Sequence, residues 1–157
     1  MSDRIEAVFE GATSSLRLGI ERYEFPEIVD DEWDSNWLIV TGQVELDQKP
    51  WRFRDACLAT FEIQQLAEWL DNVASNKGKQ AFCAFIEPTL GFEQTSDGII
   101  RIGFSLEALP PWETRDSDFG EIGFDVPIDE RLKVAANSLR QLLTQFPVRE
   151  HNIANGS

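Results

Sequence analysis

The chain has 157 residues, 42% hydrophobic and 27% charged, so it is long enough and apolar enough to fold around one hydrophobic core. Its formal net charge of −14 argues against a nucleic-acid-binding protein and against docking on an anionic membrane, because both need lysine and arginine. The charge is compatible with simple solubility or with a basic protein as partner.

The N-terminus and the two cysteines bear on where the protein works. The first residues lack the basic and apolar regions of a signal peptide, which predicts a cytoplasmic protein. Cys57 and Cys83 lie in apolar, strand-like surroundings, which favours buried and reduced thiols.

The first clear strand pattern begins at residue 16. Apolar residues occupy every second position over residues 16–20, and then Tyr23 and Phe25 carry the apolar face one position out of phase. Because a slip of one residue turns the side chains to the other face, we expect a β-bulge near Glu21–Arg22. Residues 1–15 are compatible with a short helix or a strand.

The segment that follows is strongly acidic. Six carboxylates lie within eleven residues: Glu24, Glu27, Asp30, Asp31, Glu32 and Asp34. Carboxylates can bind Ca²⁺, but the spacing is not that of an EF-hand loop. Three interpretations stay open: a solvated loop, a cation site, and a recognition loop with Trp33 as its aromatic anchor, because tryptophan is favoured at binding hot spots.

A β-hairpin is predicted after this segment. Residues 38–46 alternate between apolar and polar positions, and Trp51 and Phe53 resume the alternation after the turn residues at 47–50. The second strand carries arginines on its other face.

An amphipathic helix is predicted next. Apolar residues recur at spacings of three and four over residues 63–74, which is the pattern of a helix that buries one face. We expect Thr60 to be its N-cap and Glu62 to lie in its first turn, where the helix dipole favours a negative charge.

The second half of the chain predicts further strands. Residues 80–86 are almost all apolar, which predicts a central strand covered on both faces. Residues 90–94 and 100–106 alternate on either side of the Ser-Asp-Gly sequence at 96–98, which predicts a second hairpin.

The chain ends with a loop, a strand and a helix. The prolines of residues 109–118 predict a stiff loop, whose Trp112 is compatible with packing on the core or with contacting a partner. A strand is predicted over residues 122–128, followed by a helix that Asp129 caps and Pro147 ends.

These elements predict an α+β protein with a largely antiparallel, curved sheet of about seven strands and two long helices packed on it. We expect residues 1–150 to form one domain and residues 151–157 to be a disordered tail.

Motifs for catalysis are missing from the sequence. The one histidine, His151, lies in the predicted tail, and there is no zinc-binding, phosphate-binding or dinucleotide-binding motif. Asp55 is compatible with an ion pair to a nearby arginine or with a catalytic role, but no second catalytic group accompanies it. We therefore predict no catalytic residue, no metal and no cofactor.

Parts of the chain resemble bacterial immunity proteins of the WapI type. The similar stretches lie at residues 30–40, 53–58, 66–70, 111–112, 124–126 and 146–147. The specific part is the motif W-D-S-N-W at residues 33–37. The resemblance covers residues 16–149. It implies a cytosolic protein that binds and neutralises the nuclease domain of a cell-wall-associated toxin, and it brings no catalytic residues.

Two hypotheses follow. The first is a non-enzymatic protein that binds a basic protein partner. Its candidate partner-binding residues are Glu27, Asp30, Asp31, Glu32, Trp33, Asp34 and Trp112. The alternative is a small enzyme or ligand-binding domain with a carboxylate-lined cleft under the loop at residues 109–118. A structural subunit is a third possibility.

Overall fold

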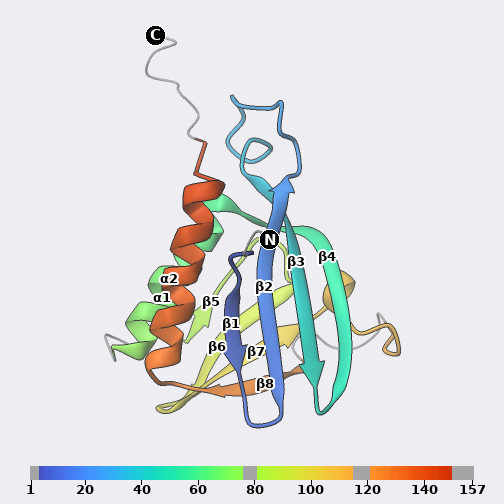
Figure 1. Cartoon of the computed structure of the whole chain (residues 1–157), viewed down its shortest axis with the longest axis vertical. Helices are drawn as coiled ribbons and strands as arrows, with labels where there is room; N and C mark the ends of the chain where they lie inside the picture. Colours follow the sequence, from blue (N-terminus) through green and yellow to red (C-terminus); the bar gives the residue numbers. More distant parts are fainter. Residues whose placement is uncertain (1–3, 76–80, 115–120, 150–157) are drawn as a thin grey trace.

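A computed structural model describes residues 4–75, 81–114 and 121–149, and its strands form two antiparallel sheets of four strands each (Figure 1). One sheet contains, in spatial order, β1 (Ala7–Glu10), β2 (Ser14–Tyr23), β3 (Trp37–Leu46) and β4 (Lys49–Ala59). The other contains β5 (Phe82–Cys83), β6 (Leu90–Ser96), β7 (Ile99–Phe104) and β8 (Ile122–Pro127). The helices are α1 (Thr60–Ala74), the short 3-10 helix η1 (Leu106–Ala108) and α2 (Glu130–Gln145).

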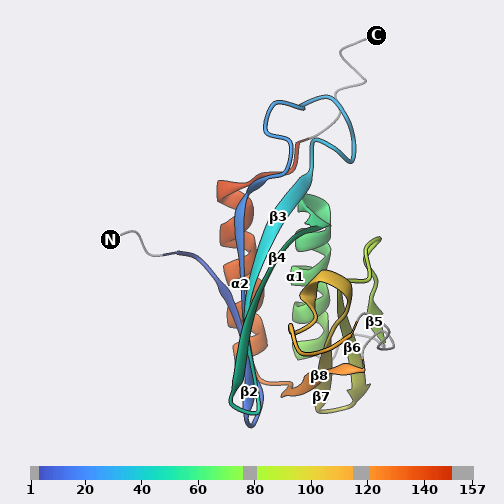
Figure 2. The same ribbon diagram turned by 90° about the vertical axis from the view of Figure 1, so that its right-hand side faces the viewer.

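The two sheets face each other, and the two long helices lie beside one another along one side of the pair (Figures 1 and 2). Helix α2 contacts β1, whereas α1 contacts β4 and β5. Aromatic rings join the sheets: the ring centroids of Phe9 and Phe92 are 5.5 Å apart, as are those of Trp51 and Phe104. The hydrophobic core therefore lies between the sheets and extends under the helices.

The predicted α+β class, with antiparallel strands and two long helices, is confirmed. The strands form two sheets instead of the single curved sheet that we expected. Alternation along the chain identifies hairpin neighbours, but it carries no information about which hairpins share a sheet. Here α1 lies between the two groups of strands in the chain, and the second group returns to face the first.

The predicted details of the first sheet are also found. The register between β2 and β3 shifts between Ile20 and Arg22, where we expected the β-bulge. The turn between β3 and β4 places Asp47 and Gln48 at φ angles of 50° and 74°, the left-handed conformations of a tight hairpin turn. Within the N-terminal segment that was compatible with a helix or a strand, residues 7–10 form the strand β1, and residues 1–3 lie outside the described ranges.

The prediction of a central strand over residues 80–86 is wrong. Residue 80 lies outside the described ranges, and of residues 81–86 only Phe82 and Cys83 form a strand, β5. This strand lies at the edge of its sheet, and Phe82 is 67% exposed. The chain then turns toward α1, where Gln65 donates a hydrogen bond to the carbonyl of Ala84. The prediction failed because the exposed residues of this segment, such as Phe82 and Ile86, are as apolar as the buried Cys83. Hydrophobicity alone therefore does not distinguish the covered positions from the exposed ones.

The N-terminal ends of both long helices are capped by side chains, in one case by a different residue from the one predicted. Asp129 caps α2 as predicted, accepting a hydrogen bond from the Arg131 amide at 2.9 Å. The N-cap of α1 is Ala59 and not Thr60. The buried carboxylate of Glu62 accepts hydrogen bonds from the amides of Ala59, at 3.0 Å, and Ile86, at 2.9 Å, and so performs the capping itself.

Glu62 should therefore make stability depend on pH in a definite direction. Burial raises the pKa of its carboxyl, outweighing the two amide hydrogen bonds that lower it. The folded protein therefore holds the carboxyl proton of Glu62 more tightly than the unfolded chain does. The contribution of Glu62 to the free energy of unfolding is fully present below the pKa of the unfolded chain, and it is lost as pH rises through the pKa of the folded protein. We expect the free energy of unfolding of wild type minus that of Glu62→Gln to fall as pH rises from about 4 to about 7. Denaturant titrations of both proteins across this range measure it, and a rising difference would contradict the expectation.

Both cysteines are buried free thiols, as the sequence predicted. Burial raises the pKa of Cys57 and of Cys83, that of Cys83 to about 12.

Among the described residues, no helix is both long and apolar enough to cross a membrane.

Candidate functional site

The acidic segment forms a loop that projects from one end of the first sheet. We call residues 24–36 the acidic loop; it joins β2 to β3 and extends beyond the ends of both strands (Figures 1 and 2). The amide of Glu24 donates a hydrogen bond to the carbonyl of Trp37 at 2.9 Å, which closes the loop at its base. The hairpin arrangement of β2 and β3 thus gathers the acidic residues at one end of the molecule.

Most of the predicted binding residues lie together on this loop and are exposed. The exposed carboxylates are those of Glu27, Asp30, Asp31, Glu32 and Asp34. Val29 lies among them, and its side chain is 61% exposed. An exposed apolar residue surrounded by charged ones resembles the composition of a protein interface, where an apolar centre has a polar rim.

Asp31 has a structural role within the loop. Its carboxylate accepts hydrogen bonds from the amides of Trp33, at 3.0 Å, and Asp34, at 2.8 Å, while its own amide donates to the hydroxyl of Ser35. Such bonds from an aspartate to the amides two and three residues later fix a tight turn. Asp31 therefore shapes the loop as well as adding charge to it.

Trp33 belongs to the base of the loop more than to its tip. Its ring packs edge-on against Phe61 of α1, with centroids 4.7 Å apart. It also lies against the Trp37 ring in a tilted arrangement, with centroids 5.3 Å apart. The side chain is partly buried as a result. The aromatic anchor that the sequence suggested for a partner is thus engaged within the protein.

Asn36 connects the loop to two distant parts of the chain. Its side chain is buried; the amide group donates to the carbonyls of Glu32, at 2.7 Å, and Arg149, at 2.9 Å. Its carbonyl oxygen accepts from the Thr60 hydroxyl, at 2.5 Å, and from the Arg149 amide, at 2.8 Å. The asparagine of the W-D-S-N-W motif therefore joins the acidic loop, the start of α1 and the segment after α2.

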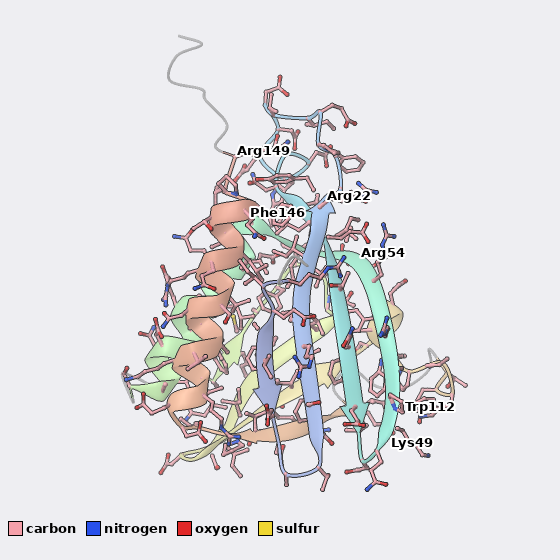
Figure 3. The ribbon with its side chains drawn as sticks, in the orientation of Figure 1. Arg22, Lys49, Arg54, Trp112, Phe146 and Arg149 are labelled. Carbon is pink, nitrogen blue, oxygen red and sulfur yellow. The ribbon has the colours of Figure 1, made fainter. Side chains whose placement is uncertain are left out.

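The segment after α2 packs against the loop, which sequence reasoning missed. We call residues 146–149 the C-terminal arm. The Tyr23 hydroxyl donates to the Pro147 carbonyl at 2.5 Å, and the Tyr23 ring lies edge-on to Phe146. The guanidinium of Arg149 lies 3.7 Å from the centre of the Tyr23 ring, and Figure 3 shows it beside the loop.

Glu24, at the base of the loop, has a perturbed carboxyl group. The pKa of Glu24 is raised, first by its burial and then by the nearby carboxylates of Asp34 and Asp55.

No group of three His, Cys, Asp or Glu side chains in the described ranges is arranged to hold a metal ion.

Trp112 does not belong to this surface. It lies at the other end of the molecule, as Figure 3 shows, and its side chain is 48% exposed. Its ring is edge-on to that of Trp51 at 5.6 Å, and the Lys49 ammonium lies 5.8 Å from it. The ring therefore packs on the core residue Trp51, and its contact with a partner stays a prediction.

Neither of two cavities on the sheets is lined by the described residues of the loop that was expected to cover a cleft. One, of about 460 Å³, lies on the second sheet and is lined mainly by apolar residues, among them Phe82, Phe85 and Phe92, together with Glu93 and Arg101. Another, of about 540 Å³, is an open hollow on the outer face of the first sheet between Arg17 and Arg52. Residues 109–114 line neither of them, and residues 115–120 lie outside the described ranges.

Comparison with known proteins gives one finding about the family. The chain matches the immunity protein WapI-like family over residues 8–147, a range that contains both long helices and the whole acidic loop. No curated protein and no solved structure matches the chain. A family of immunity proteins implies a toxin as the binding partner. The resemblance found around residues 30–37 is thereby confirmed, and the chain belongs to the WapI-like immunity protein family.

Proposed function

We propose that this immunity protein neutralises the nuclease domain of a toxin, without catalysis or a cofactor, by placing the acidic loop against a basic surface of that domain. The observation that carries the proposal is the gathering of exposed carboxylates around Val29 on a projecting loop, in a chain with a net charge of −14. A nuclease must hold a polyanion, so its substrate-binding surface is basic. Opposite potentials accelerate encounter and favour the correct partner.

The internal order of the loop supports a role in binding. Asp31, Asn36 and the packing of Trp33 fix the loop before any partner is bound. Binding then costs less conformational entropy than it would for a flexible loop. We further propose that binding takes place in the cytoplasm and that neither nucleic acid nor a membrane is a partner.

Trp112 is a separate candidate. Because it lies at the opposite end of the molecule, it contributes only if the partner covers the length of the first sheet or makes a second contact. Its half-exposed ring is compatible with such a contact.

Charge reversal on the loop should weaken toxin binding strongly. Asp30 and Glu32 are exposed, and within the described residues their carboxylates make no hydrogen bond, so Asp30→Lys/Glu32→Lys leaves the internal bonds of the loop intact. We expect a loss of about 2.7 kcal/mol in binding free energy, about 100-fold in Kd, because two attractive charges become repulsive. Isothermal titration calorimetry against the purified nuclease domain of the cognate toxin measures it.

A matched control separates local from global charge. Glu45→Lys/Glu68→Lys changes the net charge by the same amount, but on β3 far from the loop and on α1. The control should keep most of the affinity, and the loss in the loop variant should shrink as salt screens the charges. Equal affinities for the two variants would count against the loop as the binding surface.

The alternative of an enzyme or ligand-binding domain has less support. It requires a carboxylate-lined cleft under residues 109–118. The two cavities described above lie on the sheets instead, and each has one glutamate among its lining residues, Glu93 in one and Glu45 in the other.

A further inference from the structure

Arg149 is the point at which the C-terminal arm holds the acidic loop. One terminal nitrogen of its guanidinium donates to the carbonyls of Pro26, at 2.9 Å, and Ile28, at 2.7 Å, and lies 3.5 Å from that of Phe25. The same guanidinium stacks on Tyr23. These carbonyls lie on the part of the loop that leads directly to Val29 and Asp30.

The backbone of Arg149 is engaged as well. Its amide and its carbonyl both bond to the side chain of Asn36, at 2.8 Å and 2.9 Å. Arg149 therefore contacts both halves of the loop. Its guanidinium bonds to the first half, at residues 25–28, and its backbone bonds to Asn36 at the end of the second half. One residue thus sets the distance between the two sides of the loop.

We propose that Arg149 is a positioning residue for toxin binding: the C-terminal arm is a latch that keeps the acidic loop in its binding conformation before the toxin arrives. This inference rests on the proposed function for its role in binding. Its structural part does not, since the loop conformation can be measured in the isolated protein. The loop needs such a latch because its closely spaced carboxylates repel one another and favour an expanded, mobile loop.

Arginine suits this position better than lysine would. The guanidinium is planar and directs several N–H groups from one rigid fork, so it can bond to two carbonyls while its face stacks on an aromatic ring. An ammonium group has the same charge but cannot do both at once. Arg149→Lys therefore distinguishes the geometry of the latch from its charge.

The first test measures the loop in the isolated protein by hydrogen exchange. In Arg149→Ala and in Arg149→Lys we expect the amides of Ile28, Trp33 and Asp34 to exchange about tenfold faster than in wild type, because the loop opens more often. Arg140→Ala is the matched control, since it removes one cation and an ion pair to Asp71 on the helices, away from the loop. Unchanged exchange in both Arg149 variants would overturn the proposal.

The second test measures binding to the purified nuclease domain of the cognate toxin. We expect both Arg149 variants to bind about tenfold more weakly, and this loss should persist at high salt, unlike that of Asp30→Lys/Glu32→Lys. Faster exchange with full affinity, while the charge reversal weakens binding, would overturn the role of the latch and leave the proposed function standing. If both Arg149 variants and Asp30→Lys/Glu32→Lys all bound with full affinity, the acidic loop would not be the interface. The proposed role of Arg149 in positioning that loop for binding would then fail as well.

Discussion

Asn36→Leu should lower the free energy of unfolding by about 4 kcal/mol and the midpoint of thermal unfolding by about 12 °C. The replacement has nearly the same shape but no hydrogen-bonding group. It leaves four groups without their partner: the Thr60 hydroxyl, the Glu32 carbonyl, and the amide and carbonyl of Arg149. A buried polar group without a partner costs about 1–3 kcal/mol, and the Thr60 hydroxyl is fully buried. Differential scanning calorimetry and urea titration measure the effect.

A neighbouring residue supplies the control for this variant. Ser35 is as buried as Asn36, but its hydroxyl accepts a single hydrogen bond, from the Asp31 amide at 2.8 Å. Ser35→Ala should therefore cost about 1 kcal/mol. If Asn36→Leu cost no more than Ser35→Ala, Asn36 would be one polar contact among many and not the junction of three segments.

Gly42→Ala should lower the free energy of unfolding by about 3 kcal/mol, with a fall of about 9 °C in the thermal midpoint. Gly42 on β3 lies opposite Phe53 on β4, and a Cβ at Gly42 would come within 2.1 Å of the Phe53 ring. That ring is nearly buried and packs on Phe104 of the other sheet, with centroids 6.3 Å apart. To admit the methyl group, Phe53 must move and disturb the contact between the sheets.

Gly91 gives a matched control because it is also a strand glycine, on β6, but a methyl group added there would have no neighbouring atom within 4 Å. Gly91→Ala should leave stability unchanged or raise it by up to about 0.5 kcal/mol, since alanine loses less backbone entropy on folding than glycine. Urea titrations of the two variants should thus give changes of opposite sign or clearly different size. Two equal and small changes would mean that Phe53 is free to move aside.

Local patterns in the sequence predicted the elements that depend on local geometry. The hairpin of β3 and β4, the bulge near Arg22 and the cap at Asp129 follow from alternation, phase and side-chain chemistry within a few residues. The edge position of β5 does not, because Phe82 is apolar and yet exposed. The division into two sheets also depends on contacts between residues far apart in the chain.

The candidate site was predicted only in part. The sequence placed the carboxylates together on a loop between two strands, and the structure agrees. It gave no sign that Asn36 and Arg149 meet, because a polar pair 113 residues apart follows no period. For the same reason it grouped Trp112 with Trp33, although the two rings lie at opposite ends of the molecule.

The wide separation of Asn36 and Arg149 along the chain has a consequence during synthesis. The ribosome must add 113 further residues after Asn36 before the arm that supports the loop exists. At about 5–20 residues per second, this delay is roughly 6–23 s. A nascent chain already displays its carboxylates in that interval but lacks the support that shapes them, so incomplete translation products should protect poorly against the toxin even where their first sheet has formed.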